Sequence, residues 1–66
     1  MLAQNIKKFR KKAKLSQEAL AQKADITYST LIKIESGAND NPTVKTLVKI
    51  AKALKVMIND IVDDRS

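Results

Sequence analysis

The chain has 66 residues, so residues 1–66 are expected to form one small domain, and its 44% hydrophobic residues are typical of a folded protein. Cysteine and histidine are absent, which excludes disulfides and the common zinc sites and leaves little for nucleophilic catalysis. The formal net charge is +6, and residues 1–14 carry six basic side chains and no acidic one, which favours an anionic partner such as DNA, RNA or acidic lipid.

The first part of the chain predicts two helices. An apolar stripe at helical spacing predicts the first over about residues 2–14. Ser16 is a good N-cap for a second, short helix over 17–24, and Leu15 and Leu20 stand where a hydrophobic staple would form across that cap. The stripe of the first helix consists of Leu2, Ile6, Phe9 and Ala13.

The middle of the chain repeats this arrangement. Thr27 is a suitable cap for a third helix over 28–36, which Gly37 can end in a left-handed conformation. After a polar loop, Thr43 caps a fourth helix over about 44–55. The inward positions predicted for this fourth helix are Val44, Leu47, Ile50, Ala51 and Leu54.

The end of the chain predicts one more short helix, over 58–62. Val56 and Ile61 are placed to staple it, although Met57 is a poor residue for its cap. Residues 63–66 are expected to be a frayed tail. Since strand-like alternation is not sustained anywhere, the fold class predicted is an all-α, compact five-helix bundle.

Residues 17–37 carry the most information about function. Two short helices joined by a tight turn can cross steeply only where small side chains line their contact, and Ala21 is small enough for this. Leu20, Ala24, Ile26, Leu31 and Ile34 then point inward. Because successive helical residues turn by about 100°, the third helix is left with a defined outer face. That face consists of Tyr28, Ser29, Ile32, Lys33 and Ser36.

The chemistry of this outer face suits the DNA major groove. Lys33 can donate to guanine acceptors, Ser29 can bond to several base edges, and Ile32 or the Tyr28 ring can cover a thymine methyl. Gln17, at the start of the second helix, is placed where a side-chain amide can hold a phosphate. Some of these residues could also have a purely structural role. Tyr28 can pack on its own helix, and a lysine can simply be solvated.

The segment LSQEALAQKADITYSTLIKIESG, followed by NPTVKTLVKIAKALKV, resembles the helix-turn-helix of the phage-repressor and Cro-like superfamily, the XRE family. The resemblance spans about residues 2–62 and implies a lambda-repressor-like domain, bacterial or phage-encoded, with its third helix in the major groove. It implies an ion pair between Arg10 and Glu35 that fixes the tilt of that helix. The base contacts it implies are Thr27, Tyr28, Ser29, Ile32 and Lys33. The phosphate contacts it implies are Gln17, Ser36, Asn39 and Asn41.

The sequence departs from the family pattern at three places. Asp25 stands in the turn where glycine is usual, but aspartate tolerates left-handed geometry better than most residues. The loop over residues 37–42 is about one residue longer than usual, which puts its phosphate contacts in doubt. Met57 replaces the usual capping residue before the last helix.

Together these features predict a sequence-specific regulator of transcription, most simply a repressor that binds a palindromic operator in double-stranded DNA as a homodimer. Its half-sites would lie roughly 34 Å apart. The dimer contact is expected from residues that could instead close the core, namely Met57, Ile58, Ile61 and Val62.

The alternatives within binding proteins are an antitoxin or restriction-modification controller of the same fold, and an adaptor for protein or RNA that lacks DNA specificity. An enzyme is the weakest class, because the acidic residues show no pairing that suggests a site. No apolar run approaches the roughly 20 residues of a membrane span and no signal peptide is recognised, so we expect a cytoplasmic protein. No metal, cofactor, membrane or small-molecule ligand is expected.

Overall fold

The computed structural model describes residues 2–62, and over these residues the chain is all-helical, as the sequence predicts. The tail predicted over 63–66 lies outside the described residues. The helices are α1 (Leu2–Lys12), α2 (Gln17–Ala24), α3 (Tyr28–Ser36), α4 (Val44–Leu54) and α5 (Ile58–Val62).

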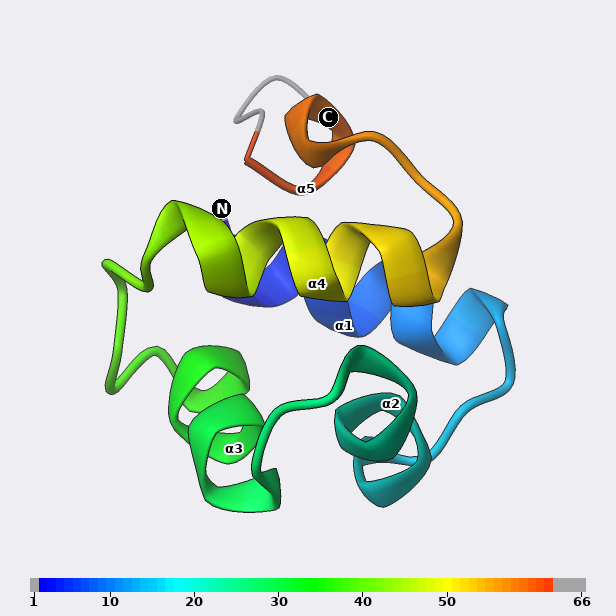
Figure 1. The fold of residues 1–66 in the computed structure, drawn as a ribbon, viewed down its shortest axis with the longest axis horizontal. Helices are drawn as coiled ribbons and strands as arrows, with labels where there is room; N and C mark the ends of the chain where they lie inside the picture. Colours follow the sequence, from blue (N-terminus) through cyan, green and yellow to red (C-terminus); the bar gives the residue numbers. More distant parts are fainter. Residues whose placement is uncertain (1, 63–66) are drawn as a thin grey trace.

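The helices lie in three levels (Figure 1). In this view α4 crosses in front of α1 at the middle level, α2 and α3 lie together below them, and α5 lies above. The helix α3 packs against α1 and α2, whereas α5 packs against α1 and α4. Because α2 and α3 form the outermost level, each keeps one face that no other helix covers.

Three helix starts are fixed by hydroxyl caps, which confirms the capping pattern of the sequence. Ser16, Thr27 and Thr43 have extended backbones, and each side chain accepts a hydrogen bond from the backbone N–H three residues later, at 3.0 to 3.2 Å. These bonds satisfy N–H groups that have no partner within the helix. The starts of the short helices α2 and α3 are therefore fixed by their own capping residues, Ser16 and Thr27.

The first helix ends at Lys12, two residues before the end that its apolar stripe predicts. Lys14 takes a left-handed conformation, with φ of 61°, and the N–H of Leu15 donates to the carbonyl of Arg10 at 3.1 Å. This closes the helix as a Schellman-type turn and brings Leu15 against the core. As a result Ala13 is exposed rather than part of the buried stripe.

The fourth helix differs from its prediction at both ends. It stops one residue early, because Lys55 is left-handed with φ of 60° and ends the helix. At its start, Val44 was expected to point inward but is 69% exposed. The buried residues of α4 begin only at Leu47, one turn later, so the first turn stands clear of the core.

The last helix forms despite the weak capping residue at its start. Asp60 makes the other half of a capping box, because its Oδ2 accepts from the backbone N–H of Met57 at 2.9 Å. At the other end, the buried amide of Asn5 on α1 donates to the carbonyl of Ile61 at 3.1 Å. A local cap and a tertiary bond thus hold these five residues in place.

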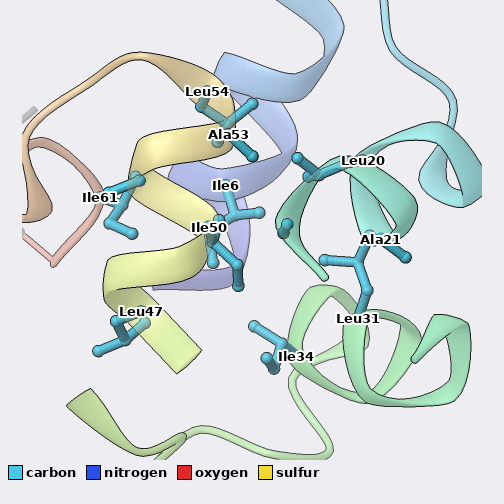
Figure 2. Packing of buried hydrophobic residues seen from close by; sticks show 12 residues of the cluster. Ile6, Leu20, Ala21, Leu31, Ile34, Leu47, Ile50, Ala53, Leu54 and Ile61 are labelled. Carbon is cyan, nitrogen blue, oxygen red and sulfur yellow. The ribbon is translucent and has the colours of Figure 1, made fainter. Parts of the chain in front are cut away.

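The core lies where all five helices meet (Figure 2). Ala21, at 3% exposure, lies between α2 and α3, as the motif requires. Ile61 is completely buried in the single chain, so of the two roles that the sequence left open for it, closing the core and contacting a second copy, it takes the first. The side chain is unavailable because α5 packs across α1 and α4 and uses Ile61 to close the core. The fully buried large side chains are Ile6, Leu20, Leu31, Ile34, Ile50 and Ile61.

Candidate nucleic-acid interface

The helix α3 presents the outer face that its sequence predicts. Leu31, Ile34 and Glu35 are buried, which turns the opposite side toward solvent. Tyr28 is 50% exposed at the start of the helix. Ser29, Lys33 and Ser36 are exposed along it, whereas Ile32 is half-buried. The face therefore combines hydroxyls, one cation and apolar surface, which are the groups that base edges in the major groove can contact.

The first turn of α3 is set by hydroxyl groups. Thr27 accepts the N–H of Thr30 at 3.2 Å, and the two hydroxyls lie 2.7 Å apart in a further hydrogen bond. The cap of α3 therefore occupies the Thr27 hydroxyl in the free protein. The base contact implied for this residue remains a prediction, and it would have to coexist with the cap.

The turn between α2 and α3 accepts an aspartate in place of the usual glycine. Asp25 is left-handed, with φ of 57°, and its N–H donates to the carbonyl of Gln22 at 3.2 Å. The following N–H, of Ile26, reaches the carbonyl of Ala21 at 3.0 Å. Lys49 of α4 donates to the Asp25 carbonyl at 3.4 Å, which ties this turn to the middle level of the fold.

The loop after α3 holds the other residues expected at phosphates. Gly37 has φ of 85°, and the N–H of Asn39 returns to the carbonyl of Lys33 at 2.9 Å. The side-chain oxygen of Asn39 accepts the N–H of Asn41 at 3.1 Å, and the hydroxyl of Ser36 bonds to the Lys33 carbonyl at 3.2 Å. These bonds fold the longer loop against the end of α3. The three predicted residues, Ser36, Asn39 and Asn41, are thereby linked near the end of α3.

A buried ion pair joins α1 to the last turn of α3. The Nε of Arg10 lies 2.8 Å from Oε2 of Glu35, and the two side chains are only 11% and 2% exposed. The Nη1 of Arg10 also donates to the carbonyl of Leu15 at 2.9 Å. This is the pair that the family resemblance implies. It fixes α3 against both α1 and the turn that leads into α2.

Gln17 takes part in the same network, which the sequence did not reveal. Its Nε2 donates to Oε1 of Glu35 at 3.0 Å, so both oxygens of this one carboxylate are bonded. No local pattern signals the bond, because it joins the first residue of α2 to the last turn of α3, eighteen positions away. The residue expected at a phosphate is therefore also hydrogen-bonded to α3.

Most basic side chains in the described part of the chain take part in no salt bridge. Between residues 2 and 62, the pair of Arg10 and Glu35 is the only salt bridge. The lysines of α1 and α4 lie at the surface or are half-buried, so they leave a positive field that attracts polyanions. Within the same stretch there is no group of acidic, histidine or cysteine residues that could hold a metal, and no helix is long and apolar enough to cross a membrane.

Comparison with known proteins identifies relatives over almost the whole chain. The sequence model of the helix-turn-helix family matches residues 6–61. The chain is 34% identical over 65 residues to the transcriptional regulator SinR of Bacillus subtilis, covering 98% of this chain and 59% of SinR. It is 38% identical over 65 residues to the immunity repressor protein of Bacillus phage phi105, covering 98% of this chain and 44% of that protein. The chain thus spans about half the length of these two relatives.

Solved structures of SinR have the same fold. The N-terminal DNA-binding domain of SinR from Bacillus subtilis superposes with a TM-score of 0.94 at 34% identity, covering 98% of this chain and 94% of that one. The crystal structure of SinR, described as the master regulator for biofilm formation, in complex with DNA superposes with a TM-score of 0.92 at 35% identity. That match covers 96% of this chain and 100% of that one.

Proposed function

This chain belongs to the helix-turn-helix family, as its resemblance to XRE-family proteins implies, and we propose that it is a DNA-binding regulator of transcription. The observation that carries the proposal is the uncovered face of α3, with Tyr28, Ser29 and Lys33 outward on a helix whose other side is locked into the core. The relatives support it, since SinR is a transcriptional regulator with a structure in complex with DNA. Such a protein would act in the cytoplasm and would need no enzymatic activity.

In this proposal α3 enters the major groove and the surrounding polar groups hold the backbone. Lys33 and Ser29 bond to base edges, and Tyr28 and Ile32 cover apolar base surface beside Thr27. The uncompensated lysines strengthen binding to any sequence, while the outer face of α3 provides the preference. The phosphate contacts are proposed for Gln17, Ser36, Asn39 and Asn41.

We further propose repression through a two-fold dimer on a palindromic operator. One short module reads few base pairs, so a second copy is needed for useful specificity. Met57, which precedes α5, is 69% exposed, Val62 at the end of α5 is 42% exposed, and Ile58 is half-buried. A second copy would cover this surface, and the phage immunity repressor supports the sign of regulation.

The first test is the selection of binding sites from a random DNA pool, followed by affinity for the selected site and for scrambled duplex over a range of salt. The proposal expects a two-fold-symmetric site bound at least about 10³-fold more tightly than scrambled DNA. If no motif emerges and binding simply falls with salt, the positive charge acts without specificity. An adaptor for protein or RNA then becomes the better description of the domain.

Replacing Lys33 by alanine sharpens this test. We expect discrimination to fall by about 1–3 kcal/mol at one base pair in each half-site, because a base-edge contact is lost. Lys8→Ala is the matched control, since Lys8 is exposed on α1 and should change the salt dependence alone. Repeating the site selection with both variants measures the difference. An unchanged motif for the Lys33 variant would remove this residue from base recognition.

A further inference from the structure

Glu35 is a buried carboxylate. Among the residues proposed to contact DNA, its side chain is hydrogen-bonded to Gln17 alone. Its side chain is 2% exposed, and its two oxygens accept separately from Arg10 and from Gln17. We infer that Glu35 is a positioning residue for the phosphate contact of Gln17, and that this amide bridges two anions, the buried carboxylate and a DNA phosphate. The inference rests on the proposed function, because it assumes that Gln17 meets the DNA backbone.

The orientation of the Gln17 amide follows from the chemistry of its partner. An ionised carboxylate only accepts hydrogen bonds, so the nitrogen end of the amide has to face Glu35. That nitrogen carries two N–H groups, and the bond of 3.0 Å to Oε1 uses one of them. Since Gln17 is half-buried, its remaining N–H can be presented to a phosphate at the start of α2. The amide is thus oriented before DNA arrives, which lowers the entropy lost on binding.

Arg10 makes this arrangement compatible with a nearby phosphate. Only the side chain of Gln17 would separate the Glu35 carboxylate from a bound phosphate. If the charge of the carboxylate were uncompensated, it would repel that phosphate. The guanidinium lies 2.8 Å from the other oxygen of Glu35, and it is itself anchored on the Leu15 carbonyl at 2.9 Å. The pair is neutral overall, so Glu35 can orient Gln17 without opposing the DNA. The same carboxylate also fixes the end of α3, so backbone contact and groove insertion depend on one group.

A double-mutant cycle tests whether the two residues act together. The proteins are the wild type, Gln17→Met, the paired replacement Arg10→Met with Glu35→Leu, and all three changes combined. Replacing both members of a buried pair by apolar residues avoids an isolated buried charge, and so preserves the fold. Gln4→Met is the matched control, since Gln4 is exposed on α1. Affinity is measured for the selected site and for scrambled duplex at fixed salt.

We expect Gln17→Met to lower the affinity for both duplexes by about tenfold. The variant loses a hydrogen bond to a charged phosphate but keeps the contacts to the bases. In the background that lacks Arg10 and Glu35, the same change should cost less than about threefold, since an unanchored amide contributes little. Equal losses in the two backgrounds would show that Gln17 acts without the carboxylate. No loss for Gln17→Met in the wild-type background would equally overturn the inference.

A second measurement does not depend on DNA specificity. Glu35→Gln keeps the volume of the side chain but offers one acceptor oxygen where the carboxylate offers two. In NMR spectra of the free wild type, one of the two Gln17 side-chain N–H protons should exchange slowly, and it should lose this protection in Glu35→Gln. Addition of scrambled duplex should shift the other proton. Fast exchange of both protons in the free wild type would contradict the anchoring.

These experiments separate the inference from the function on which it rests. Phosphate contacts form on any duplex, so the cycle can be completed with scrambled DNA even if no preferred site exists. The absence of a preferred site would count against the proposed regulator, while the coupling of Gln17 to Glu35 would still be decided. If binding is sequence-specific but the effects of Gln17→Met and of the paired replacement simply add, the proposed regulator is supported and the inference about Glu35 is contradicted.

Discussion

The two ends of α3 are held in different ways. At its start, the Thr27 hydroxyl caps a backbone N–H three residues away, and the preceding turn closes within a few residues. At its end, Glu35 is bonded to Arg10 on α1 and to Gln17 on α2, which lie 25 and 18 positions away in the chain. The start of the helix is thus a local structure, and its end is a tertiary one.

This difference bears on function, because the two ends control different properties of the interface. In the proposed complex with DNA, the cap would determine where α3 begins and therefore which side chains reach the bases first. The hydrogen bonds of Glu35 with Arg10 and Gln17 determine the angle at which α3 packs against α1 and α2. A change at the start should be felt locally, whereas a change at the end should disturb three helices together.

The largest effect is expected from Glu35→Leu alone. This change leaves the Arg10 guanidinium without its anion in a site that is only 11% exposed, so we expect a loss of about 3–5 kcal/mol in the free energy of unfolding. That is a large part of the 5–15 kcal/mol typical of native proteins. Urea unfolding followed by circular dichroism measures it. The paired replacement of Arg10 by Met and Glu35 by Leu should recover most of the loss, and a mild effect of Glu35→Leu would show that the pair does not hold the fold.

A smaller effect is expected at the other end of the helix. Thr27→Ala removes the hydroxyl that caps α3, and the loss of such a cap costs about 1 kcal/mol. The same unfolding experiment checks this value, with Thr27→Ser as the control that keeps the hydroxyl. A loss as large as that of Glu35→Leu would mean that the two ends are not held differently after all.

The smallest effect is expected in the turn before α3. Asp25→Gly relieves the left-handed backbone at φ of 57° but increases the freedom of the unfolded chain, so the two contributions nearly cancel. We expect a change within about 0.5 kcal/mol in either direction. Thermal unfolding of the two proteins side by side measures it. A large gain in stability would reveal strain that the aspartate does not tolerate.

Most of the helix limits could be predicted because they rest on neighbouring residues. Ser16, Thr27 and Thr43 are caps by virtue of their hydroxyls, and Gly37 ends α3 through its backbone freedom. The two helix ends predicted too late, those of α1 and α4, are set by left-handed lysines, Lys14 and Lys55, a conformation that the residue type does not signal. Val44 is exposed because no helix covers the first turn of α4.

The candidate interface divides in the same way. The outward positions of α3 follow from helical periodicity once its apolar side is known, so Tyr28, Ser29 and Lys33 could be predicted. The bond of Gln17 to Glu35 could not, since periodicity says which face a residue occupies and nothing about which helix that face meets. For the same reason the sequence left open whether Ile61 closes the core or contacts a second copy.

The sequence by itself therefore determined the helices, their caps, the outer face of α3 and the family. Only the tertiary structure decided that Gln17 shares a carboxylate with Arg10 and that Asn5 anchors α5 to α1. The physical reason is distance along the chain. Capping bonds and helical periodicity act over three or four residues, while a buried polar group takes whichever partner the packing of the helices brings to it.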